Sequence, residues 1–208
     1  MIKYVDVGAR GGVKQIVRLQ KDIIEVHAFE PNPDEWEDLG KLVWWDNAKL
    51  YPYALWSCDR TLDLYITKNP GYTSVYKPLP LAEWLEVERG EQVDARTLDS
   101  FDIEPDFIKI DTQGSELDIL KGSVRSLEGC TGVEAEVELQ RVYEDQPLKK
   151  DVDRFMESLG FSLWKTTAVR AVVDGVWFTD AIYLKDGTEG TKTRQVIESF
   201  YNKGVDGG

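Results

Sequence analysis

The sequence predicts an α/β fold built on a mostly parallel, doubly wound sheet. Short apolar runs rich in β-branched residues alternate along the chain with segments of helical period, as is typical of such folds. Two of these runs end in an acid that precedes a glycine-containing turn and a helical segment. Because the 208 residues contain no repeat, low-complexity block or linker, we expect one domain over 1–208, with a core of 3–186 and an extension of 187–208.

The first part of the chain predicts three strands that alternate with two helices. Proline and an acid at the start of the second helical segment suit a first helical turn. The expected elements are a strand at Lys3–Val7, a helix at Gly11–Gln20, a strand at Ile24–Phe29, a helix at Pro33–Val43 and a strand at Lys49–Leu55.

The segment after the third strand interrupts this alternation. Ser57–Arg60 has the composition of a turn, and apolar residues alternate with polar ones over Thr61–Thr67, which predicts a small antiparallel excursion. The irregular segment from Lys68 to Leu81 contains aromatic residues. Since loops of this length in a compact domain are usually functional or disordered, we expect this one to be functional.

The remainder of the chain returns to the alternating pattern. We expect the sheet to continue with a strand that lies next to the first one, and to end with two closing strands. The expected elements are strands at Phe107–Asp111, Gly132–Leu139, Phe161–Lys165 and Val176–Leu184, helices at Ser115–Leu127, Leu148–Leu159 and Thr191–Tyr201, and a frayed end at Gly204–Gly208.

Composition excludes several classes of function. With 25 basic and 38 acidic residues, the net charge of −13 opposes a nucleic-acid partner. The single histidine, His27, excludes a two-histidine metal site, and its strand position favours a packed side chain. Cys58 and Cys130 have the spacing of neither a zinc site nor a disulfide framework. We therefore predict no metal.

The chain carries no sign of export or of a membrane. Its first residues lack the apolar core of a signal peptide, and no window approaches the ~20 apolar residues of a spanning helix. We expect a cytoplasmic protein without a membrane partner.

The first strand runs into a glycine-rich turn that suits S-adenosylmethionine better than NAD. A dinucleotide fingerprint needs a second glycine where this chain has Arg10, and the carboxylate of Asp6 would face the phosphates. S-adenosylmethionine has a sulfonium, an ammonium and a ribose diol but no phosphate. Glu30, at the end of the second strand, can accept hydrogen bonds from both ribose hydroxyls. Each motif taken alone has an alternative: the glycine-rich turn can be purely structural, and Glu30 can be a solvated acid in a turn.

A later motif, from Asp106 to Gly122, again places an acid and a glycine between a strand and a helix. In a doubly wound sheet this strand lies beside the first one. We therefore expect Asp111 to point into the same crevice as Asp6 and Glu30.

Together these motifs resemble the FkbM-type S-adenosylmethionine-dependent methyltransferases. The resemblance covers about residues 4–165 and is carried most specifically by DFIKIDTQGSELDILKG. The other motifs are VDVGARGG (Val5–Gly12), HAFEPNP (His27–Pro33), the turn at Ala54–Asp59, GYTSVY (Gly71–Tyr76), RTLDSF (Arg96–Phe101) and EVELQRVYEDQPL (Glu136–Leu148).

The resemblance implies a single methyltransferase-like domain with a Rossmann-like sheet of seven strands, the last antiparallel, and the cofactor over the first two strand ends. Glu30 would hold the ribose. The other implied cofactor-binding residues are Asp6, Gly8, Arg10, Gly11, Pro31 and Asn32. Members of the family typically O-methylate sugars or secondary metabolites, so the implied partner is a small-molecule acceptor; a homo-oligomer stays open.

Two features depart from the family. Similar sequences often have an acid where this chain has Gln113, which puts any role of an acid there in doubt. The first strand begins at residue 3, so we expect the cover of the site to come from 68–88, another subunit or a longer parent chain.

Asp111 is the first candidate for a general base, or for orienting the acceptor, and Glu136 is the second. The alternatives are that Asp111 caps the following helix, and that Glu136 is one of three alternating acids on a solvated strand face. In the irregular segment, Tyr72 and Tyr76, with Trp84, predict an aromatic wall, and Ser74 between them is a further substrate-binding candidate.

The prediction is thus a methyltransferase that acts on a hydroxyl. A non-catalytic module that binds S-adenosylmethionine or a nucleotide is the alternative from another class, and an NAD-linked oxidoreductase is the alternative of the same fold. Preferential binding of NAD would separate the oxidoreductase from the other two.

Overall fold

The structure is a computed structural model, and it describes residues 1–18, 20–42, 46–167, 169–173 and 176–202. The expected frayed end at Gly204–Gly208 lies outside these residues, as do Leu19 and Val43 within two of the expected helices.

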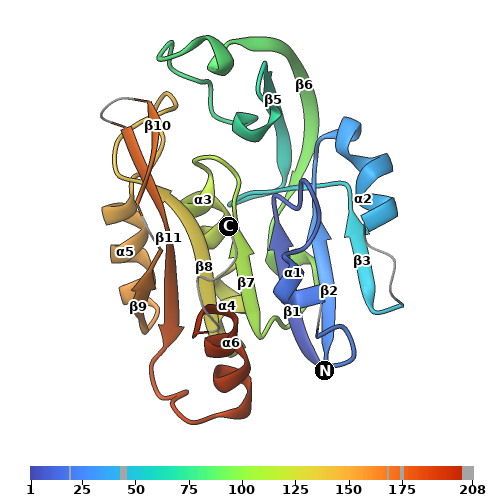
Figure 1. The fold of residues 1–208 in the computed structure, drawn as a ribbon, viewed down its shortest axis with the longest axis vertical. Helices are drawn as coiled ribbons and strands as arrows, with labels where there is room; N and C mark the ends of the chain where they lie inside the picture. Colours follow the sequence, from blue (N-terminus) through green and yellow to red (C-terminus); the bar gives the residue numbers. More distant parts are fainter. Residues whose placement is uncertain (19, 43–45, 168, 174–175, 203–208) are drawn as a thin grey trace.

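A mostly parallel main sheet forms the centre of the molecule (Figure 1). Its strand order is β10-β11-β8-β7-β1-β2-β3, with β9 paired to the side of β11. Strands β3, β2, β1, β7 and β8 are parallel, and β11 is antiparallel to β8, as expected for the last strand. The strands are β1 (Ile2–Val7), β2 (Ile24–Phe29), β3 (Ala48–Tyr51), β7 (Phe107–Ile110), β8 (Gly132–Glu138), β9 (Phe161–Thr166), β10 (Arg170–Val173) and β11 (Val176–Lys185). The sheet has eight described strands where seven were expected, and β10 is the addition.

Helices cover both faces of this sheet, which confirms the doubly wound arrangement. On one face α3, α4 and α5 bury apolar side chains against alternate residues of β1, β7 and β8, such as Val5 and Ile108. On the other face α1, α2 and α6 pack against Tyr4, Val26 and Phe107. The helices are α1 (Gln15–Arg18), α2 (Trp36–Leu42), α3 (Glu116–Lys121), α4 (Val124–Gly129), α5 (Lys149–Ser158) and α6 (Lys192–Asn202). Short 3-10 turns lie at η1 (Pro33–Glu35), η2 (Pro70–Tyr72), η3 (Glu83–Leu85) and η4 (Leu98–Phe101).

Two predicted helices differ most from their expected bounds. The helix predicted at 11–20 begins only at Gln15, because Gly11 and Gly12 have φ angles of 75° and 86°, outside the helical region. The helix predicted at 115–127 divides into α3 and α4. Here the hydroxyl of Ser123 donates to the carbonyl of Ile119 and so satisfies a backbone group at the end of α3.

A small three-stranded sheet follows β3 and lies beyond the carboxyl ends of β1 and β2 (Figure 1). It comprises β4 (Ala54–Leu55), β5 (Arg60–Thr67) and β6 (Val87–Arg96), in the order β4-β6-β5. The expected excursion is confirmed as β5, which pairs with β6 in antiparallel fashion. Strand β6 was not expected, because its sequence is polar and buries only Val93 and Ala95.

His27 is packed as predicted: it is 4% exposed, and its Nδ1 lies 3.0 Å from the hydroxyl of Tyr51. Among the helices of the described residues, none has the length and apolar character needed to span a membrane.

Candidate functional site

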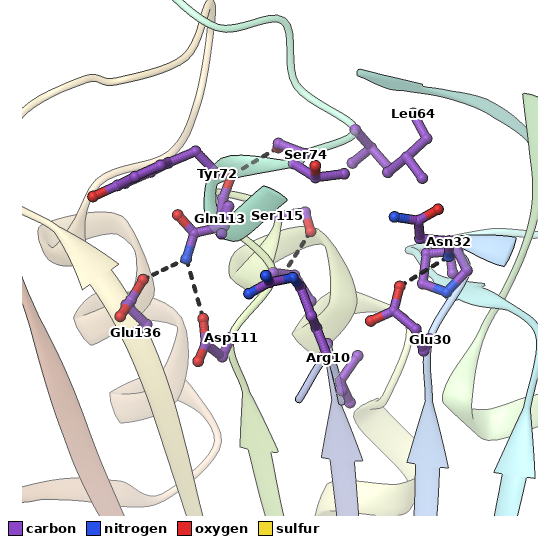
Figure 2. A pocket seen from close by; sticks show the side chains of 18 of the residues that line it. Arg10, Glu30, Asn32, Leu64, Tyr72, Ser74, Asp111, Gln113, Ser115 and Glu136 are labelled. Atoms are coloured by element: carbon purple, nitrogen blue, oxygen red, sulfur yellow. Dashed lines mark hydrogen bonds between the residues drawn. The ribbon is translucent and has the colours of Figure 1, made fainter. Parts of the chain in front are cut away.

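A cavity of about 390 Å³ opens at the carboxyl ends of β1, β2, β7 and β8, between these ends and the small sheet. Figure 2 shows that Glu136, Asp111, Arg10 and Glu30 follow one another along this edge. Of the residues expected to form the site, those that line the cavity are Gly8, Arg10, Glu30, Pro31, Asn32, Tyr72, Ser74, Asp111 and Glu136. Asp6, Gly11 and Tyr76 are not among its lining residues.

Gly8 brings the end of β1 against the end of β7. Its φ of 76° lies in the left-handed region, and its N–H donates to the carbonyl of Phe29 at 3.0 Å. A Cβ at this position would lie 2.0 Å from the carbonyl oxygen of Asp111. Only glycine therefore fits here, and the tight turn sets Gly8 and Asp111 side by side at the floor of the cavity.

Asp6, expected in the cofactor turn, is buried within the sheet and is not among the residues that line the cavity. The side chain is 1% exposed, and Lys109 Nζ lies 3.1 Å from Asp6 Oδ1 and 3.4 Å from Asp111 Oδ2. Burial raises the pKa of Asp6, while Lys109 acts in the opposite direction. Burial alone would lower the pKa of Lys109, but the carboxylates of Asp6, Asp111 and Glu134 raise it overall.

Glu30 presents a buried carboxyl group at the end of β2. It is 5% exposed, and its Oε1 accepts a hydrogen bond from the N–H of Asn32 at 2.8 Å (Figure 2). Burial raises the pKa of Glu30 to about 7, although the N–H groups of Asn32 and Arg10 act in the opposite direction. The Asn32 side chain accepts from the N–H of Asp34 and thereby caps η1. Arg10 lines the cavity, with Nε 3.1 Å from Glu35 Oε1.

Asp111 and Glu136 are joined by the side chain of Gln113 (Figure 2). Gln113 Nε2 donates to Asp111 Oδ1 at 3.1 Å and to Glu136 Oε1 at 2.6 Å. The two acids expected to act on the acceptor therefore lie at one wall of the cavity, with an amide between them. That bridge was not predicted, because the sequence distinguishes Gln113 only as an amide where similar sequences often have an acid.

The acids of β8 are buried or, for Glu136, 12% exposed, so the alternative of a solvated strand face is wrong. Glu134 and Glu138 are 2% and 3% exposed. Helix α6 covers Glu134, whose Oε2 accepts from the hydroxyl of Tyr201 at 2.6 Å. Burial raises the pKa of Glu136 to about 8, and the negative charges of Asp111 and Asp180 act in the same direction. Glu138 also lines the cavity, although it was not predicted as a site residue. The alternation of acids along β8 is the sequence feature that indicates it.

The segment from η2 to Val75 covers the cavity, as expected. Ser74 Oγ donates to the carbonyl of Gln113 at 2.7 Å, and Tyr143 Oη donates to the carbonyl of Tyr72 at 3.1 Å. Tyr76 instead donates to Asp118 Oδ2 at 2.7 Å and lies outside the cavity. Trp84 is 41% exposed and is not a lining residue, so Tyr72 is the member of the predicted aromatic wall that lines the cavity. The other aromatic lining residues are Phe29, Tyr53 and Phe178.

A second cavity, of about 300 Å³, adjoins the first on the face that carries α1. Both cavities have Asp111, Glu136 and Phe178 in their lining. In addition the second is lined by Lys14, Lys109, Ile110, Glu134, Arg170 and Asp180. The two candidate acids therefore stand at a wall that both cavities share.

Solved structures support the same fold at low sequence identity. The chain is similar to a methyltransferase FkbM from Methylobacillus flagellatus KT, with 19% identity, a TM-score of 0.59, and coverage of 88% of this chain and 43% of that chain. It is also similar to magnesium protoporphyrin IX methyltransferase from Synechocystis PCC 6803, solved with bound SAM, with 9% identity, a TM-score of 0.52, and coverage of 88% and 69% of the two chains. The present chain thus spans less than half the length of the Methylobacillus protein. No curated protein sequence matches it.

The sequence profile of the methyltransferase FkbM domain matches residues 6–163. This span includes the ends of β1, β2 and β7, the segment from η2 to Val75 that covers the cavity, and Gln113. It confirms the resemblance that the motifs indicate. The chain belongs to the methyltransferase FkbM domain family.

Proposed function

We propose that this protein transfers the methyl group of S-adenosylmethionine to a hydroxyl oxygen of a small molecule, a sugar or a secondary metabolite. The observation that carries the proposal is the place of Glu30. Its carboxyl group is buried at the end of β2, holds one N–H of the following turn and lines the cavity, as a partner for a ribose diol must.

The side chains that line the cavity suit a cationic ligand. Four acids line it, namely Glu30, Asp111, Glu136 and Glu138. Among its described lining residues Arg10 is the only basic one, and it pairs with Glu35. Such a lining favours a sulfonium and an ammonium, and it opposes the pyrophosphate of NAD. A volume of about 390 Å³ lies within the usual range of cofactor sites.

The acid pair at the shared wall suits a hydroxyl acceptor. When bound, S-adenosylmethionine would supply a methyl carbon that forms a bond to the acceptor oxygen as its bond to sulfur breaks. Asp111 or Glu136 would accept the proton that this hydroxyl loses, a contribution of about 10²–10⁴-fold for a general base. The cover segment and the paired acids would hold the acceptor in line, and such positioning supplies much of the rate of a displacement.

Calorimetry with S-adenosylmethionine, S-adenosylhomocysteine and NAD tests the cofactor. We expect the first two to bind and NAD to bind weakly or not at all, whereas preferential binding of NAD would overturn the proposal. A labelled-methyl screen over glycosides, phenols and hydroxylated metabolites then tests the reaction, with an Asp111→Asn, Glu136→Gln double variant as the control. Cofactor binding with no transfer to any acceptor would favour a non-catalytic module.

A further inference from the structure

Gln113 lies where three segments of the chain meet above the sheet. Its side-chain N–H groups reach Asp111 at the end of β7 and Glu136 in β8. Its side-chain oxygen accepts from the hydroxyl of Tyr143 at 3.3 Å. The single hydroxyl hydrogen of Tyr143 is shared between that oxygen and the carbonyl of Tyr72. Because carboxylate oxygens accept hydrogen bonds, the amide is oriented with its nitrogen toward both acids.

The backbone at Gln113 is held in an uncommon conformation. Its φ of 60° is in the left-handed region, which is costly for a residue with a side chain. The cover segment secures this conformation, since Ser74 Oγ donates to the carbonyl of Gln113. A strained residue that is fixed by contacts from other segments and aims its amide at two acids suggests a role in the site.

Charged groups surround the bridge on every side. Lys109 lies 3.4 Å from Asp111 Oδ2, and Arg170 of β10 lies 3.3 Å from Glu136 Oε2. Further acids face the pair from the adjacent elements: Asp180 of β11, Glu138 of β8 and Glu116 of α3. A negative group between Asp111 and Glu136 would add to this repulsion, whereas a neutral amide donates to both acids without adding charge.

We propose that Gln113 is a positioning residue that holds Asp111 and Glu136 together at the shared wall, poised to take the proton of the acceptor hydroxyl. This inference rests on the proposed function, because it concerns the same wall of the same cavity. The amide fixes the separation of the two acids, and its hydrogen bond to Glu136 favours the ionised form of that acid.

Two variants separate this role from a merely structural one. Gln113→Met keeps the length of the side chain but removes both donors, so the ionised form of Glu136 loses a hydrogen bond. Gln113→Glu adds a third carboxyl group. We expect the titration midpoint of Glu136 to rise by about 1 pH unit in Gln113→Met and further in Gln113→Glu.

The measurement is a carboxyl ¹³C NMR titration of the full chain between pH 5 and pH 10. Asp111→Asn and Glu136→Gln variants assign the two signals. Coincident Glu136 midpoints in the wild type, Gln113→Met and Gln113→Glu would overturn the inference. Far-ultraviolet circular dichroism shows which variants are folded, and Tyr143→Phe provides a further test that leaves position 113 intact. We expect its Glu136 midpoint to rise less than in Gln113→Met, and an unchanged midpoint there would also count against the inference.

The titration needs neither cofactor nor acceptor, so its outcome is separate from that of the proposed function. Calorimetry with S-adenosylhomocysteine on the same proteins completes the design. Failure of the wild type to bind would count against the proposed function alone. Normal binding with an unmoved titration would count against the role of Gln113 alone.

Discussion

Lys109 Nζ lies 3.1 Å from Asp6 Oδ1, and this buried ion pair joins the neighbouring strands β1 and β7. The Lys109 and Asp6 side chains are 11% and 1% exposed. The same ammonium group lies 3.4 Å from Asp111 Oδ2, at the edge of the cavity. One lysine thus connects the polar interior of the sheet to a candidate catalytic acid.

Removing this lysine should destabilise the fold. Lys109→Met leaves Asp6 as a buried charge without its partner, and we expect a loss of about 3–5 kcal/mol in the free energy of unfolding. Urea denaturation at pH 7 measures it. The control is Lys68→Met, which removes exposed pairs with Glu83 and Glu86 and should destabilise the fold far less than Lys109→Met. Equal effects of the two substitutions would show that the Asp6 pair is not structural.

Gly8→Ala should disrupt the turn between β1 and β7. The added Cβ would meet the Asp111 carbonyl, and the φ of 76° disfavours any side chain, so we expect a loss of stability of about 1–3 kcal/mol. Gly40→Ala is the matched control, because Gly40 lies in α2 with nothing within 4 Å of an added Cβ. It should stabilise the protein by about 0.5–1 kcal/mol. Thermal unfolding compares the two, and a neutral Gly8→Ala would contradict this reading of the turn.

The central strands could be predicted because their signal is local. Both Lys3–Val7 and Ile24–Phe29 are apolar runs that become buried parallel strands, and the observed bounds differ by at most one residue. Strand β6 lacks that signal, since one face of its hairpin is solvated and its residues are mainly polar. Its pairing with β5 is a long-range property that no local pattern carries.

The site could be predicted by position but not by orientation. The acids Glu30 and Asp111 line the cavity because each follows a parallel strand at the same edge. Asp6 also lies near that edge, but its side chain pairs with Lys109, which is 103 residues away in the sequence. The bridge from Gln113 to Glu136 likewise spans two strands, so its residue type alone could not reveal it.

Replacing Glu30 should weaken cofactor binding. Glu30→Gln keeps the shape of the side chain but removes the charge that would accept two ribose hydroxyls. We expect the affinity for S-adenosylhomocysteine to fall by about 1–3 kcal/mol, measured by calorimetry at pH 8. Glu88→Gln, at an exposed position of β6, is the control and should bind as the wild type does. Unchanged affinity in Glu30→Gln would remove the ribose assignment.

The stability of the protein without ligand should fall as the pH rises from 5 to 8. Burial raises the pKa of Glu30 and of Glu116 to about 7 and that of Glu136 to about 8, above the ordinary value of 4.5. Between the unfolded and folded pKa values the folded state binds more protons. Each group can therefore lower the free energy of unfolding by up to about 1.4 kcal/mol per pH unit. Burial lowers the pKa of His27, which acts in the opposite direction near pH 6.5, but the carboxyl groups with a raised pKa outnumber it.

Urea denaturation at pH 5, 6, 7 and 8 measures this slope. Glu30→Gln should flatten it between pH 5 and pH 7, and Glu136→Gln should flatten it up to pH 8, because an amide does not titrate. Glu88→Gln should leave the slope of the wild type unchanged, since its side chain is exposed. A stability that rises with pH across this range, or a slope that neither buried substitution alters, would show that these acids titrate near their ordinary pKa.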